Sequence, residues 1–124
     1  MSTQTPLARV EGLGAAHSGT VRFWRQRVSA VALIPLSIWF VYAALVLVGA
    51  DREAVIVFLH RPVNAVAMTL FVIATLNHSV LGLQVVVEDY VHIKGLKIAL
   101  LLSNQLLAWI LGAVSLFALA KIAL

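Results

Sequence analysis

The sequence predicts an all-α membrane protein with three transmembrane helices, and three observations predict it. The chain of 124 residues is 62% hydrophobic and 11% charged, whereas soluble domains are about 45–50% apolar and about 25% charged. So short a chain has too little polar surface to cover a water-soluble globule. Three long stretches, residues 28–50, 63–87 and 98–120, contain no Asp, Glu, Lys or Arg. Each exceeds the roughly 20 residues that a helix needs to cross a bilayer.

The segment before the first span is polar and ends in basic and aromatic residues. Residues 21–27 read Val-Arg-Phe-Trp-Arg-Gln-Arg, a combination typical of the membrane–water interface. We therefore divide the chain into a cytoplasmic tail with an interfacial segment, residues 1–27, and a three-helix membrane domain, residues 28–124.

The distribution of Lys and Arg predicts the orientation. A cytoplasmic N-terminus places six basic residues inside and three outside: Arg9, Arg22, Arg25, Arg27, Lys94 and Lys97 against Arg52, Arg61 and Lys121. Basic residues favour the cytoplasmic side, so we expect the N-terminus inside and the C-terminus outside. The connection 51–62 then faces outward, with Pro62 in the first turn of the second helix. The connection 88–97 faces the cytoplasm, with Gly95 as its turn residue.

Composition and charge exclude several classes of function. The absence of cysteine excludes disulfides, thiolate metal sites and a cysteine nucleophile. The net charge of +4 reflects the small number of acidic residues and the preference of Lys and Arg for the cytoplasmic side of a membrane protein. We therefore expect no nucleic-acid partner. No predicted span carries the carboxylate that a small proton-coupled transporter needs. The polar groups in the spans exceed what three helices satisfy among themselves, so we expect a partner chain.

The second span contains most of these polar residues. Asn77 and Gln84 are seven residues apart and lie on nearly one helix face, so we expect them to form interhelical hydrogen bonds. Thr69, Thr75 and Ser79 are expected to bond to carbonyl groups of their own helix.

His78 lies near the middle of the membrane, because it precedes Glu88 by ten residues, or roughly 15 Å of helix. A neutral imidazole there must pair both ring nitrogens or leave a polar atom in hydrocarbon. An interhelical hydrogen bond, a proton relay and ligation of a metal such as haem iron all fit. Ala74 and Gly82 flank His78 at one-turn spacing. Such a stripe of small residues suits a flat macrocycle and helix packing equally well.

The second helix ends in an acidic residue and a tyrosine at the interface. Asp89 follows His78 by eleven residues and lies on almost the same face. Tyr90 is either an aromatic anchor or a hydrogen-bond donor to a carbonyl oxygen in a proton route.

The pattern His78, Gly82, Asp89, Tyr90 resembles the second helix of the D-type hydrophobic membrane anchor subunit of succinate dehydrogenase, respiratory complex II. Residues 27–30, Arg-Val-Ser-Ala, are similar to the same family, as are the tail, the spans and the length. The resemblance implies a second three-helix anchor, the C-type cytochrome b subunit, as partner. It also implies one haem b and a ubiquinone site between the anchors. FAD and iron–sulfur clusters would belong to the flavoprotein and iron–sulfur subunits held on the membrane.

The resemblance implies a role for each residue of the pattern. His78 matches an axial haem ligand and is the expected metal ligand, and Gly82 matches a glycine of the same helix. Tyr90 matches the tyrosine that hydrogen-bonds a quinone carbonyl, with Asp89 in a supporting role. Arg27 is our first candidate cation for the haem propionates, and Arg22 and Arg25 are further candidates. A role in topology is the alternative for all three.

The resemblance further implies that the chain is no enzyme alone, because succinate would be oxidised on a flavin in another subunit. A cofactor-free membrane anchor or assembly protein stays open as an alternative, and a small multi-pass transporter is less favoured. The N-terminus has no mitochondrial transit pattern, so we expect a bacterial inner membrane. Three histidines outside the spans are interpreted as solvated interfacial residues: His17, His60 and His92. Of these, only His92, two residues past Tyr90, is placed to lie near a quinone pocket.

Overall fold

The computed structural model describes residue 7 and residues 17–124, and residues 17–124 are almost entirely helical. The helices are α2 (His17–Val46), α3 (Arg52–His60), α4 (Pro62–Tyr90) and α5 (Lys94–Ala123). Segments of α2, α4 and α5 are long and apolar enough to cross a membrane, namely Gly19–Val46, Pro62–Tyr90 and Lys94–Ala123. The prediction of an all-α protein with three membrane-spanning helices is confirmed.

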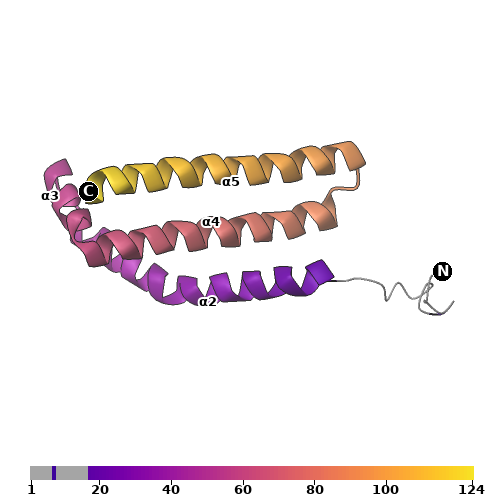
Figure 1. Ribbon diagram of the computed structural model, residues 1–124, viewed down its shortest axis with the longest axis horizontal. Coiled ribbons are helices and arrows are strands. Elements are labelled where there is room, and N and C mark those ends of the chain that lie inside the picture. The colour runs from indigo at the N-terminus through magenta and orange to yellow at the C-terminus, as the bar shows by residue number, and fades with distance from the viewer. Residues whose placement is uncertain (1–6, 8–16) are drawn as a thin grey trace.

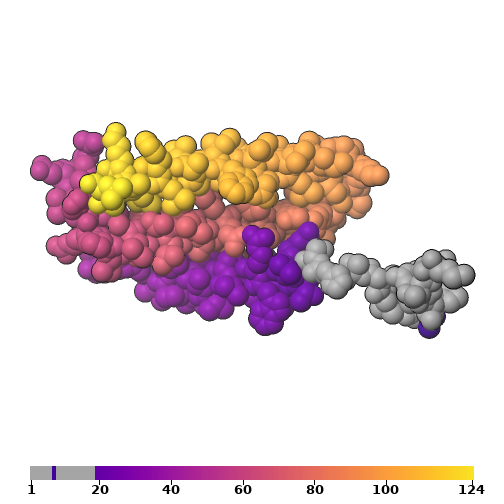
Figure 2. All heavy atoms as spheres, in the orientation of Figure 1, coloured from indigo at the N-terminus to yellow at the C-terminus, as the bar shows by residue number. Residues whose placement is uncertain are grey.

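The three long helices form one layer with α4 in the middle. Figures 1 and 2 show α2 and α5 on opposite sides of α4, with α3 at the end where α5 finishes. Within the described part of the chain, α2 and α5 each pack against α4 but not against each other. Few of its residues are buried: Ser29, Ala43, Leu59 and Leu81. Most of the apolar surface therefore faces lipid or another chain.

Helix α2 begins before the predicted span. It starts at His17 and includes residues 21–27, so the basic aromatic segment continues the membrane helix. The earlier part of the predicted tail, residues 1–6 and 8–16, lies outside the described residues. Pro35 lies inside α2 as expected, and the helix bends along its length in Figure 1.

The first connection contains a helix that our sequence interpretation did not include. Asp51 caps α3 by accepting a 2.8 Å hydrogen bond from the Ala54 amide, and Glu53 in the first turn complements the helix dipole. The chain leaves α2 through Gly49, whose φ of +74° favours glycine. Pro62 occupies the first turn of α4, as predicted.

The second connection is shorter than predicted, comprising residues 91–93. Gly95 lies in the first turn of α5, so its assignment as a turn residue was wrong. The reversal is held instead by Lys97, whose amide donates to the Ile93 carbonyl at 2.9 Å. Its Nζ donates to the Glu88 carbonyl at 2.8 Å. Because Lys97 satisfies a carbonyl at the end of α4, three residues without glycine reverse the chain.

Helix α5 is held against α4 by a polar contact within the membrane and by close packing. Asn104 Nδ2 donates to the Val80 carbonyl at 3.0 Å. At Gly112 a Cβ would lie 3.4 Å from Leu76 Cδ1, so the two helices approach closely there. Hydrogen bonds between membrane helices average about 0.6 kcal/mol and reach about 1.7 kcal/mol.

We expect Asn104→Ala to lower the free energy of unfolding of the purified protein by about 0.5–1.5 kcal/mol, because the α4–α5 hydrogen bond is lost. Unfolding by SDS in mixed micelles measures this. Ser103→Ala is the matched control, since the Ser103 hydroxyl donates to Ala99 of its own helix at 2.7 Å. If Ser103→Ala lowers the free energy of unfolding as much as Asn104→Ala does, the role of Asn104 is contradicted.

The orientation predicts which end of the layer a membrane-impermeant maleimide labels. The chain has no cysteine, and Glu53 in α3 and Lys94 at the start of α5 are exposed at opposite ends. Glu53→Cys should be labelled in intact cells and Lys94→Cys only in inverted vesicles. Labelling of both variants after denaturation in SDS is the control. The opposite pattern would reverse the orientation.

Candidate functional site

Polar contacts join one face of α2 to α4, and we call them the α2–α4 polar seam. The α2 members are Arg22, Arg25 and Ser29, spaced at i, i+3 and i+7 and therefore on one helix face. Their partners on α4 are Glu88, Asn77 and His78, respectively.

His78 occupies the inner end of this seam. Its ring is half-buried, and Nδ1 lies 3.2 Å from the Ser29 hydroxyl oxygen. Ser29 is 5% exposed. Among the described residues, the His78 ring has a hydrogen bond at Nδ1 and no partner at Nε2. The contact with α2 therefore fixes one ring nitrogen and leaves the other for a different group.

Small residues lie one turn before and one turn after His78 on α4. A Cβ added at Gly82, one turn further along, would meet no atom within 4 Å. Ala74, one turn earlier, lines a mainly apolar groove of about 580 Å³ between α2 and α4, whose lining also includes Ser29 and Asn77. Small residues on both sides of His78 leave room for a flat group or for a second chain.

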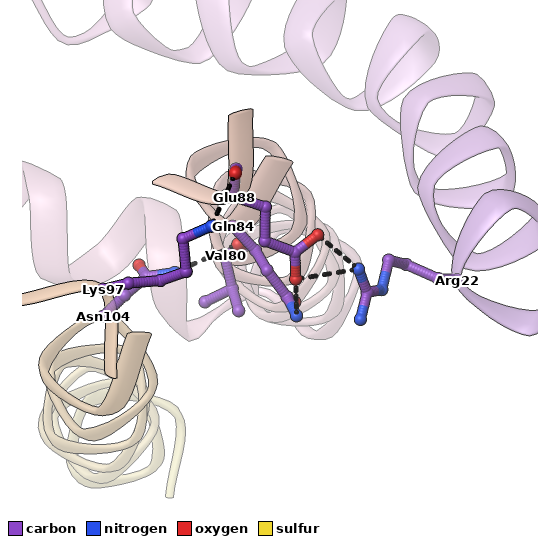
Figure 3. Close-up of polar contacts among 6 residues, drawn as sticks. All are labelled: Arg22, Val80, Gln84, Glu88, Lys97 and Asn104. Carbon is purple, nitrogen blue, oxygen red and sulfur yellow. Dashed lines mark hydrogen bonds and ion pairs between the residues drawn. The ribbon is translucent and has the colours of Figure 1, made fainter. Parts of the chain in front are cut away.

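Glu88 is the centre of a polar cluster at the outer end of the seam, shown in Figure 3. Its carboxylate accepts hydrogen bonds from Arg22 Nη1 at 2.8 and 3.0 Å and from Gln84 Nε2 at 3.0 Å. The side chains of the ion pair are 37% and 35% exposed, so the pair is worth at most about 1 kcal/mol. Lys97 binds the Glu88 carbonyl from the α5 side. The cluster thus connects the ends of all three long helices.

The structure shows the expected hydrogen bonds for one of the two amides and one of the two threonines. Asn77 accepts a 3.0 Å hydrogen bond from Arg25 on α2, which confirms an interhelical role. Gln84 donates to Glu88, one turn along its own helix, so the predicted interhelical hydrogen bond is not found among the described residues. Thr69 donates to its own helix as expected, whereas Thr75 Oγ1 is buried without a hydrogen-bond partner in the described chain.

Asp89 and Tyr90 lie in the last turn of α4, outside the seam. Both are exposed, Tyr90 to 78%. Tyr90 follows His78 by twelve residues, or about 18 Å along the helix axis. The structure therefore places His78 and Tyr90 on one helix but not in one pocket. Nearby, His92 Nδ1 lies 3.1 Å from the Tyr90 carbonyl oxygen.

Arg27 is not brought next to His78. Its guanidinium lies over the Phe23 ring, 5.1 Å from the centroid, and the residue is exposed. Arg27 precedes Ser29 by two residues, which is about 200° around the helix. It therefore faces away from the seam, while Arg22 and Arg25 face α4.

Our sequence interpretation gave Ser29 no chemical role and did not predict that Arg22 and Arg25 pair with α4. We had considered the two arginines as cations for haem propionates and favoured a role in topology. The spacing of the three residues on one helix face was the available signal. The described residues contain no cluster of three or more His, Cys, Asp or Glu able to hold a metal ion. A metal at His78 would therefore need a further ligand from another chain or from a cofactor.

Comparison with known proteins finds relatives of this chain among membrane anchor subunits. The family model described as succinate dehydrogenase/fumarate reductase transmembrane subunit matches residues 1–120. The succinate dehydrogenase hydrophobic membrane anchor subunit of Paracoccus denitrificans is 33% identical over 120 residues, covering 97% of this chain and 92% of the relative. The subunit of the same name from Rickettsia bellii is 33% identical, covering 81% and 80%, respectively. That of Rickettsia felis is 35% identical, covering 79% and 82%.

No solved structure matches the chain significantly. The sequence matches extend over nearly the whole chain and include α2, α4 and most of α5. The chain therefore belongs to the succinate dehydrogenase/fumarate reductase transmembrane subunit family and is a membrane anchor subunit of succinate dehydrogenase.

Proposed function

We propose that this anchor subunit supplies one axial ligand of a haem b, His78, and part of a ubiquinone site, at Tyr90 and Asp89. The observation that supports the proposal most directly is the pairing of His78 Nδ1 with α2. Histidines that bind metals use one ring nitrogen and hydrogen-bond through the other. Nε2 is the nitrogen without a protein partner in the described chain.

The surroundings of His78 fit a haem shared between two chains. The open surface at Gly82 gives a planar macrocycle room against α4. One histidine from this chain leaves the second axial position to a histidine of the C-type partner. Haem b with two histidine ligands supplies one-electron transfer, because no coordination position is open to oxygen. Arg27 was our candidate for the propionates, but its guanidinium lies over Phe23 on the side of α2 away from the seam, so the geometry gives this part of the proposal no support.

The open layer of helices supports a second anchor subunit as partner. Besides α2 and α5 at its two sides and α3 near its start, helix α4 contacts no other described element, so its broad faces are available to the C-type cytochrome b subunit. The chain has no cysteine, the usual ligand of iron–sulfur clusters. In the proposed complex, FAD and the clusters would belong to the flavoprotein and iron–sulfur subunits. Relatives from bacteria support the bacterial inner membrane as the location.

The end of α4 supports a site for quinone reduction. The Tyr90 hydroxyl is exposed and is suited to donate a hydrogen bond to a quinone carbonyl oxygen. Glu88 is already paired with Arg22 and Gln84, so Asp89 is the exposed carboxylate beside the tyrosine. Reduction of ubiquinone needs two electrons and two protons. A site at the interface, supplied with electrons by the iron–sulfur subunit, admits protons from water on the same side.

We expect His78→Ala to remove or shift the b-type absorbance of the purified complex while the partner subunits remain associated. The reduced-minus-oxidised optical spectrum measures this, and His92→Ala is the matched control because its ring lies in the exposed connection. An unchanged spectrum would exclude His78 as the ligand. Wild-type complex with all partner subunits but without haem would favour the cofactor-free anchor instead.

We expect Tyr90→Phe to lower kcat/KM for ubiquinone about tenfold, which corresponds to about 1.4 kcal/mol of transition-state stabilisation. Succinate oxidation with a soluble electron acceptor should not change, because it does not use this site. Tyr42→Phe is the matched control, since Tyr42 is exposed near the opposite end of the layer. Equal quinone kinetics in Tyr90→Phe and wild type would remove Tyr90 from the site.

A further inference from the structure

Ser29 is the buried polar residue of the described chain, and the proposed function uses it only as the α2 partner of His78 Nδ1. A hydroxyl in hydrocarbon costs free energy unless it is hydrogen-bonded. Ser29 Oγ has two polar neighbours, the Gln26 carbonyl oxygen at 2.9 Å and His78 Nδ1 at 3.2 Å. The first contact lies within α2 and the second links α2 to α4.

The number of protons decides which group donates in each contact. A serine hydroxyl has one proton, and a carbonyl oxygen only accepts. Ser29 therefore donates to Gln26, at the shorter distance, and its oxygen is left to accept. The proton in the contact with His78 then belongs to the ring, so Nδ1 is protonated. In a neutral imidazole the lone pair is consequently on Nε2.

The polar seam holds this pair in register. Arg25 lies one turn from Ser29 and donates to Asn77, the residue beside His78, at 3.0 Å. Two turns before Ser29, Arg22 pairs with Glu88 at 2.8 Å. With two further contacts on the same helix face, α2 cannot rotate or slide without breaking them. Ser29 is thus held opposite His78.

We propose that Ser29 is a positioning residue that selects the Nδ1–H tautomer of His78 and so presents the Nε2 lone pair to haem iron. The inference rests on the proposed function, in which His78 is an axial ligand. Ser29 contacts neither iron nor porphyrin in this role and acts only through the ring. The opposite tautomer would place a proton on Nε2, where it prevents ligation.

The same hydrogen bond has a measurable effect on the haem. Donation from Nδ1–H to an acceptor makes an imidazole ligand more basic. A more basic ligand favours the oxidised iron over the reduced iron and lowers the midpoint potential. Loss of the Ser29 acceptor therefore favours the reduced haem and raises the midpoint potential. A general change in packing does not shift the potential in a defined direction.

Redox titration of haem b in the purified complex tests the proposal on Ser29→Ala, Ser29→Cys and Ser29→Thr. The alanine and cysteine variants should shift the equilibrium towards reduced haem by about threefold to tenfold, the effect of one hydrogen bond. For a one-electron couple this is a rise of about 30–60 mV. Cysteine has nearly the size of serine but is a weak hydrogen-bond acceptor. The cysteine variant therefore tests the loss of the acceptor even if the alanine variant does not fold.

Threonine keeps the hydroxyl, so Ser29→Thr should have the wild-type potential. Ser37→Ala, at an exposed serine of the same helix, should also match wild type. Wild-type potentials in both Ser29→Ala and Ser29→Cys would overturn the proposal, as would an equal rise in Ser29→Thr. His78→Ala tests the ligand separately from the role of Ser29. If haem absorbance survives this change, His78 is not the ligand and the proposed function fails. If the absorbance depends on His78, the Ser29 variants test the positioning role alone.

Discussion

A polar atom in hydrocarbon must be hydrogen-bonded, and this constraint determines how the helices of the chain lie against one another. Apolar side chains do not choose between lipid and a neighbouring helix, because lipid tails are as apolar as leucine. The contacts that do choose are few and polar. Arg22, Arg25 and Ser29 orient α2 on α4, while Asn104 and Lys97 orient α5 on its other side. Without them, close packing such as that at Gly112 and the stacked rings of Phe40 and Phe71 would be left to set the rotation of the helices.

The fold was predictable because membrane spans depend on length and composition. Three uncharged apolar runs are sufficient to place α2, α4 and α5, and Pro62 marks the start of α4. Helix α3 was less visible, since its nine residues are too few for a span. Its signal was Asp51 as a cap with an acidic first turn. The short reversal after α4 depends on Lys97 reaching the Glu88 carbonyl, a contact that no local turn motif indicates.

The candidate site was only partly predictable, because spacing within one helix is fixed but the register between helices is not. His78 and Gly82 follow from the geometry of a single helix. The contact of Ser29 with His78 joins residues 49 positions apart in the sequence and depends on the rotation of α2 about its axis. Arg27 shows the same difficulty. It follows Arg25 by two positions, yet it faces away from α4 while Arg25 faces it.

Adjacent residues at the end of α4 differ in their surroundings, and this difference separates structural from functional roles. Glu88 is engaged by Arg22, Gln84 and, through its carbonyl, Lys97. Asp89 and Tyr90 are exposed beyond these contacts. Because Glu88 fixes the end of α4 to both neighbours, the last turn is held in place while the next two side chains stay available. In the proposed function, a quinone therefore meets an immobilised helix end, and α4 carries this end and His78 as one continuous helix.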